Sequence, residues 1–92
     1  MAENGAGMTR EQAYVLLNDI VRDELGDEDV AVTAATRAAD VRGWDSLVQI
    51  GVLAAAEIRF GIEIRAAEAE RLATVGELVD LILGKTPHLP RQ

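Results

Sequence analysis

The sequence predicts a single all-α domain, a four-helix bundle of three main helices and one short helix with a long first loop. The composition is the first reason: the 92 residues are 49% hydrophobic but include only one Trp, one Tyr and one Phe, and alanine is frequent. Such a core, built mainly from aliphatic side chains, is typical of helices. The second reason is the spacing of apolar residues, which recur at helical intervals between glycines. A chain of this length ordinarily forms one domain.

The first helix is predicted over residues 9–25. Thr9 and Gln12 form a T-x-x-Q capping box, in which each side chain satisfies a backbone N–H at the helix start. Gly26 supplies a stop signal at the other end. The apolar positions that recur at helical spacing are Ala13, Leu16, Leu17, Ile20 and Val21.

A long loop is predicted over residues 27–44, followed by a second helix over residues 46–60. The loop has no clean period, so its apolar residues must pack onto the core. Gly43 allows a tight turn before Asp45, which is a strong N-cap, and Gly61 closes the helix. The loop residues expected to reach the core are Val30, Val32 and Val41.

A short connector over residues 60–64 leads to a third, short helix, predicted over residues 66–72. Thr74 and Glu77 form a second capping box that opens the last helix, and Gly84 is expected at its end. The predicted organisation is a flexible tail over residues 1–8, a folded domain over residues 9–84 and a second flexible tail over residues 85–92.

Composition and charge exclude several classes of function. The chain has no cysteine, which excludes disulfides, thiolate metal or redox sites and a catalytic thiol of its own. A net charge of −7 makes nucleic acid an unfavourable partner and a basic protein surface a favourable one. Neither a membrane-spanning apolar run nor a signal peptide is present, so we expect a cytoplasmic protein without a membrane partner.

The negative charge gathers around the end of the first helix. Between Asp19 and Asp29 there are six acidic residues and a single base, Arg22. Such a cluster is more often a solvated helix end and loop, and the alternative is a docking surface for a basic enzyme.

The second helix is apolar on two opposite sides, with only Glu57 and Arg59 charged. Advancing 100° per residue places one group together: Gln49, Val52, Leu53, Ala56 and Phe60. The opposite group consists of Leu47, Ile50, Gly51, Ala54 and Ile58. A helix of this kind in so small a domain indicates one face toward the core and one toward a partner, although periodicity does not say which is which.

Ser46 is expected to be the first residue of this helix, with an exposed hydroxyl beside free backbone N–H groups. A phosphate attached there is stabilised by the helix dipole, although a serine is also a common helix-start residue. No base is available to make Ser46 a nucleophile, because the only histidine, His88, lies in the C-terminal tail. We therefore predict no catalytic residue and no metal site.

Three motifs in order resemble the acyl carrier proteins. They are Gly43-Trp44-Asp45-Ser46-Leu47, then Phe60-Gly61-Ile62 at the end of the same helix, then Thr74-Val75-Gly76-Glu77-Leu78. The resemblance spans residues 9–83. It implies that Ser46, flanked by Asp45 and Leu47, receives 4′-phosphopantetheine from coenzyme A through a phosphopantetheinyl transferase that uses Mg²⁺. The arm then holds an acyl group as a thioester, and the protein is a carrier rather than an enzyme.

The resemblance also assigns the two sides of the second helix. Val52, Leu53, Ala56 and Phe60 become core residues, whereas the partner face comprises Trp44, Leu47, Val48, Ile50, Gly51, Ala54 and Ile58. Trp44 has two interpretations, as a cover over the end of the core or as a contact for the arm or the transferase.

The sequence departs from its relatives in charge. The carriers of fatty-acid synthases usually have an acidic second helix, but residues 46–60 have no net charge, and Val48, Gly51 and Ile58 stand where carboxylates often do. We therefore expect a carrier for a specialised, polyketide-like or secondary-metabolite pathway that docks mainly by apolar contact. The expected partners are acyl-loading, condensing or adenylating enzymes, and the expected state is a monomer. Two alternatives stay open: an aminoacyl or peptidyl carrier, and a helical interaction module that is never modified.

Overall fold

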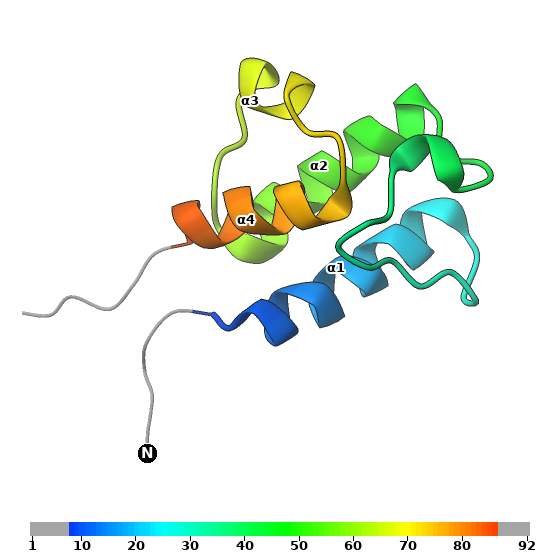
Figure 1. Ribbon diagram of the computed structural model, residues 1–92, viewed down its shortest axis with the longest axis horizontal. Coiled ribbons are helices and arrows are strands. Elements are labelled where there is room, and N and C mark those ends of the chain that lie inside the picture. Colours follow the sequence, from blue (N-terminus) through cyan, green and yellow to red (C-terminus); the bar gives the residue numbers. More distant parts are fainter. Residues whose placement is uncertain (1–7, 87–92) are drawn as a thin grey trace, which may run out of the picture.

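The computed structural model describes residues 8–86, in which every regular element is helical (Figure 1). The elements are α1 (Arg10–Leu25), the 3₁₀ turn η2 (Ala38–Asp40), α2 (Ser46–Phe60), α3 (Ala66–Glu70) and α4 (Val75–Lys85). The all-α class and the pattern of three main helices and one short helix are confirmed. Residues 1–7 and 87–92, which contain most of the predicted tails and His88, lie outside the described residues.

Helix α1 packs against both α2 and α4 and runs in the opposite direction to them, so the described ends of the chain lie on the same side (Figure 1). The core between these helices contains almost only aliphatic side chains. Its buried members are Ala13, Leu17, Ile20, Val21, Val32, Val52, Ala56, Phe60, Val75, Leu78, Val79 and Ile82. Leu16 and Leu53 are half-buried and pack against this cluster.

The glycines predicted to end α1 and α2 do so in the left-handed conformation. Gly26 has φ 66° and Gly61 has φ 69°, a backbone region in which a Cβ atom is unfavourable. The residue that follows each glycine also donates its N–H back into the helix, Asp27 to the Arg22 carbonyl and Ile62 to the Glu57 carbonyl, both at 3.1 Å. The chain therefore turns sharply at both points.

The long loop is held by two polar side chains of α1. Asn18 accepts the Val32 N–H at 2.7 Å, and the Arg22 Nε donates to the Val30 carbonyl at 2.6 Å. These contacts carry Val32 into the core, as predicted, with Val30 half-buried beside it. Val41 was also expected to pack onto the core, but it is only half-buried and is not part of that packing. The η2 turn immediately before it directs the chain along the surface instead.

Three predicted details near the C-terminal end differ in the structure. Helix α3 ends at Glu70, two residues early, and α4 continues through Gly84 to Lys85 because Gly84 keeps a helical backbone. Thr74 accepts the Glu77 N–H at 3.2 Å, but the Glu77 carboxylate accepts the Ala73 N–H at 2.6 Å rather than that of the cap residue. The second capping box is therefore half formed, with its return bond shifted by one residue.

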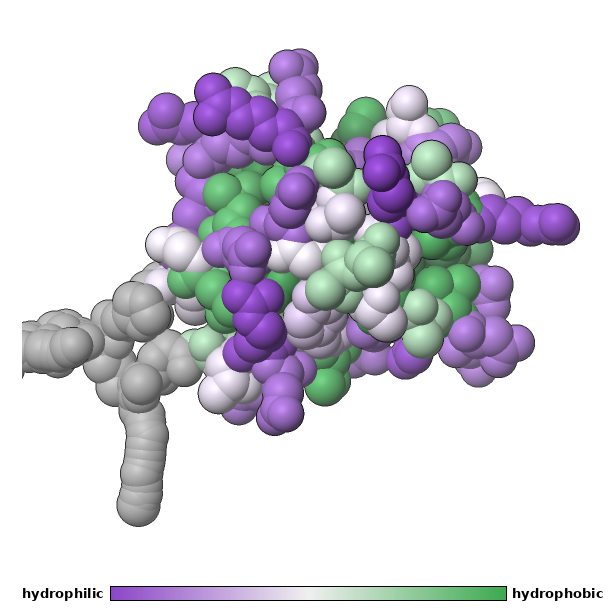
Figure 2. All heavy atoms as spheres, viewed as in Figure 1, coloured by the Kyte–Doolittle hydropathy of each residue, from purple (hydrophilic) through white to green (hydrophobic). Residues whose placement is uncertain are grey.

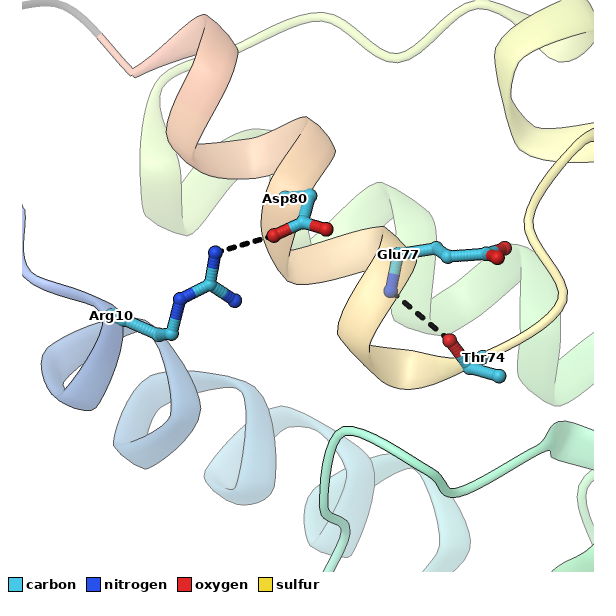
Figure 3. Close-up of polar contacts among 4 residues, drawn as sticks. All are labelled: Arg10, Thr74, Glu77 and Asp80. Carbon is cyan, nitrogen blue, oxygen red and sulfur yellow. Dashed lines mark hydrogen bonds and ion pairs between the residues drawn. The ribbon is translucent and has the colours of Figure 1, made fainter.

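Ion pairs between elements lie at the surface. Arg10 of α1 pairs with Asp80 of α4, and Figure 3 shows the two side chains pointing toward one another next to the Thr74 cap of α4. Lys85 Nζ lies 2.9 Å from Glu68 Oε2 and joins α4 to α3. On the face that Figure 2 shows, hydrophobic residues are interspersed with hydrophilic ones.

Candidate functional site

The start of α2 is built by a tight turn and a side-chain cap. Gly43 has φ 88°, and the Asp45 N–H donates to its carbonyl at 3.1 Å. The Asp45 carboxylate then accepts the Val48 N–H at 2.9 Å, as the sequence predicted for an N-cap. This arrangement makes Ser46 the first residue of the helix, with its side chain exposed.

The first two backbone N–H groups of α2 have no partner among the described residues. Among residues 8–86, the N–H groups of Ser46 and Leu47 find no hydrogen-bond acceptor, whereas Gln49 donates to the Asp45 carbonyl at 2.9 Å. The aligned peptide dipoles place partial positive charge at this end of the helix. An exposed hydroxyl beside such donors suits a phosphate ester, because the donors can bind the phosphate oxygens.

Trp44 covers the end of the core next to this site. The indole is half-buried, packs against the core and donates from Nε1 to the Gln49 side chain at 2.7 Å. That bond explains how a polar residue, Gln49, is accommodated on the core side of α2. The covering role predicted for Trp44 is therefore present in the structure.

The space beside Trp44 is small. A cavity of about 40 Å³ lies between α2, the start of α4 and the segment before it. Its lining includes Trp44, Gln49, Leu72 and Leu78. This volume corresponds to about one water molecule, so an acyl chain would enter here only if the helices moved apart.

The two apolar sides of α2 have opposite environments. Val52, Ala56 and Phe60 are buried in the core. On the opposite side Leu47 is 78%, Ile50 63% and Ile58 81% exposed, and Ala54 is exposed with them. We call these four residues the apolar stripe. The structure thus resolves the ambiguity that helical periodicity left open.

Two other residues of the predicted partner face are less accessible. Val48 is half-buried and packs against the core, so it contributes to the fold as well as to this surface. Gly51 is half-buried because the side chain of Glu24, from α1, lies over it. No pattern in the sequence predicts this contact, since the two residues belong to different helices.

Among residues 8–86 there is no histidine or cysteine, and no group of three or more acidic side chains is arranged to hold a metal ion. At the start of α2 the exposed reactive group is the Ser46 hydroxyl.

Comparisons with known proteins agree with this geometry. Residues 16–82 match the family described as "Phosphopantetheine attachment site". This chain belongs to the acyl carrier protein family. It is 37% identical to an acyl carrier protein of Exiguobacterium over 82% of this chain and 95% of that protein. It is 30% identical to an acyl carrier protein of Thermotoga maritima over 80% of this chain and 91% of that protein.

A solved structure shares the fold. The solution structure of the holo acyl carrier protein of Geobacter metallireducens superposes with a TM-score of 0.74 at 30% identity, covering 79% of this chain and 84% of that one. The chain is therefore a carrier acted on by enzymes, not an enzyme, and its prosthetic group is 4′-phosphopantetheine. Its partners include a phosphopantetheinyl transferase and acyl-handling enzymes. None of the helices described here is long and apolar enough to cross a bilayer.

Proposed function

We propose that Ser46 is the residue to which 4′-phosphopantetheine is attached, and that the carrier holds acyl intermediates on this arm. The observation that carries the proposal is the exposed Ser46 side chain at the open end of α2, beside two N–H groups that have no partner within residues 8–86. Ser46 is also the only serine in the chain. When bound, the group supplies a terminal thiol that carries the acyl chain as a thioester.

Each neighbour of Ser46 has a separate task in this proposal. The Asp45 cap fixes the first turn, so the hydroxyl oxygen that forms the phosphodiester is held outside the core. The N–H groups of Ser46 and Leu47 would be the donors available to an attached phosphate and would offset its charge. Leu47 is 78% exposed and forms the end of the apolar stripe nearest the arm.

The test is the intact mass of the protein after incubation with coenzyme A and a broad-specificity phosphopantetheinyl transferase. We expect one phosphopantetheine adduct on the wild type and none on Ser46→Ala. The substitution should leave the thermal melt nearly unchanged, because the side chain is exposed. Thr33→Ala, which removes another exposed hydroxyl, is the matched control and should be modified normally. An adduct that persists in Ser46→Ala would refute the assignment.

We further propose that the carrier serves a specialised pathway, polyketide-like or otherwise secondary-metabolite, and docks its enzymes mainly through the apolar stripe. Three exposed large aliphatic side chains on a helix with no net charge support this docking mode. The cargo is acyl, as the names of the curated relatives suggest. Condensing enzymes are the expected partners after loading, whereas an adenylating loader belongs to the aminoacyl alternative.

Salt dependence tests this docking mode. Raising salt from about 50 mM to about 500 mM should weaken partner binding by less than roughly fivefold, because apolar contact is not screened as exposed charge pairs are. Leu47→Ala and Ile50→Ala should weaken binding at all salt concentrations. A steep loss of wild-type affinity on adding salt would contradict apolar docking. A cytoplasmic location and a monomeric state complete the proposal.

A further inference from the structure

The carboxylate of Glu24 lies on the surface of α2, although the residue belongs to α1. A Cβ atom placed on Gly51 would be only 2.8 Å from the Glu24 carboxyl carbon, closer than two such carbons approach in proteins. The absence of a side chain at Gly51 therefore leaves the room that the carboxylate occupies. Glu24 itself is exposed, so its charge is accessible to a partner.

This carboxylate borders the apolar stripe. At 100° per residue, Gly51 lies about 40° around α2 from Leu47 and about 20° from Ile58. Both of those residues are more than three-quarters exposed, at 78% and 81%. A partner that covers the stripe must therefore also meet the charge above Gly51.

The single carboxylate of helix α2 itself takes part in the fold. Its only acidic residue, Glu57, is half-buried and accepts the Ile64 N–H through Oε2 at 2.7 Å. Through this bond Glu57 holds the connector between α2 and α3 in place. Glu24 is consequently the acidic group that α1 adds to the exposed surface of α2.

We propose that Glu24 is a specificity-determining docking residue, against which a lysine or arginine of the transferase pairs while an apolar patch of that enzyme covers the stripe. The inference rests on the proposed function at Ser46. The charge of the carrier supports a basic partner, since the chain has a net charge of −7 and six acidic residues between Asp19 and Asp29. Glu24 thus places a carboxylate from α1 beside the apolar stripe, in the space that Gly51 leaves open on α2.

The experiment measures kcat and KM for modification by the broad-specificity transferase. Glu24→Gln should raise KM by about two- to fivefold at low salt, the size expected for one exposed ion pair, with kcat unchanged. The difference should fade at high salt. Glu28→Gln makes the same chemical change at an exposed loop residue of the same acidic cluster, and should shift KM by less than half as much. Equal shifts in the two variants, or no shift in either, would overturn the inference.

A relocation variant tests whether position or total charge matters. Glu24→Ala combined with Gly51→Glu moves the carboxylate onto α2 and should bring KM below that of Glu24→Gln and back to the wild-type value. A KM that stays as high as in Glu24→Gln would count against the inference, provided that the thermal melt shows a folded protein. Failure of the two proposals is distinguishable: an unmodified wild type refutes the role of Ser46, whereas normal modification that is indifferent to Glu24 refutes only this inference.

Discussion

The first turns of α2 and α4 differ in what covers their free backbone N–H groups. Both helices begin with a side-chain cap that accepts an N–H, Asp45 for α2 at 2.9 Å and Thr74 for α4 at 3.2 Å. Figure 3 shows the Thr74 cap. At α4, however, the loop supplies backbone acceptors as well. The N–H of Val75 donates to the carbonyl of Thr36 at 2.8 Å, and that of Gly76 to the carbonyl of Ala34 at 3.0 Å.

At α2 the corresponding groups, the N–H of Ser46 and of Leu47, stay open among the described residues. The same capping signal thus produces a closed helix start that stabilises the fold and an open one that can receive a phosphate. The difference arises from the tertiary structure, because the loop places the carbonyls of Ala34 and Thr36 against the start of α4 and not against that of α2. An N-cap motif alone therefore does not identify a functional site.

Opening the closed start of α4 should have the largest effect on stability. In Gly76→Ala the new Cβ would lie 2.9 Å from the Ala34 carbonyl oxygen and 3.1 Å from the Ala34 Cβ. The loop must shift, at an expected cost of roughly 1–3 kcal/mol in the free energy of unfolding. Urea unfolding measures this cost.

Gly84→Ala is the matched control on the same helix, because nothing lies within 4 Å of its would-be Cβ. It should stabilise the protein by roughly 0.5 kcal/mol through the helix preference for alanine. Equal effects at the two glycines would show that the loop does not close over the start of α4.

Removing the cap of the open start should have an intermediate effect. Asp45→Ala loses the bond to the Val48 N–H, and at an exposed helix end this costs about 1 kcal/mol in the free energy of unfolding. Asp45→Asn keeps a side-chain acceptor and should remain close to wild type, which separates the cap from the charge. If Asp45→Asn were as destabilised as Asp45→Ala in the same denaturation assay, the charge rather than the cap would hold the turn.

The start of α3 differs from those of α2 and α4 because an ionisable side chain, Glu68, accepts its free N–H. Glu68 accepts the Arg65 N–H at 2.9 Å and pairs with Lys85. The Arg65 N–H, and next the Lys85 ammonium, lower the pKa of Glu68. A pKa lowered by folding means that the folded state favours the carboxylate, so the contribution is present above the ordinary carboxylate range and is lost as pH falls through the lowered value.

We therefore expect wild type to melt at a higher temperature than Glu68→Gln at neutral pH. The two melting temperatures, followed by circular dichroism, should converge in acid. The glutamine oxygen still accepts the Arg65 N–H, so the variant removes the charge and keeps the cap. A constant difference between the two proteins across the whole pH range would contradict the role of the charge.

Local signals in the sequence predicted the helices well. The Thr9 capping box, the Asp45 cap and the helix-ending glycines Gly26 and Gly61 each act within a few residues, and all four are present in the structure. Helical periodicity separated two apolar faces of α2, and the family resemblance then identified the one that packs into the core. The predicted position of Ser46 needed nothing more than the cap before it.

Contacts between distant residues were not predictable in the same way. Asn18 and Arg22 hold the loop through backbone carbonyl and N–H groups, and no sequence pattern specifies such partners. The contact of Glu24 with Gly51 depends on how closely α1 approaches α2. Gly84 was expected to end α4, but the capping at Thr86 continues the helix past it. The contacts of Asn18, Arg22 and Glu24 are set by packing, which a one-dimensional pattern does not contain, whereas the end of α4 is set by the local backbone at Gly84 and Thr86.

The apolar stripe has a consequence for the behaviour of the carrier at high concentration. Exposed leucine and isoleucine side chains attract one another between copies, and near neutral pH the like charge of each copy, −7, opposes that encounter. This colloidal protection disappears close to the isoelectric point of about 4.5. Acidic buffers therefore favour self-association and precipitation of the carrier.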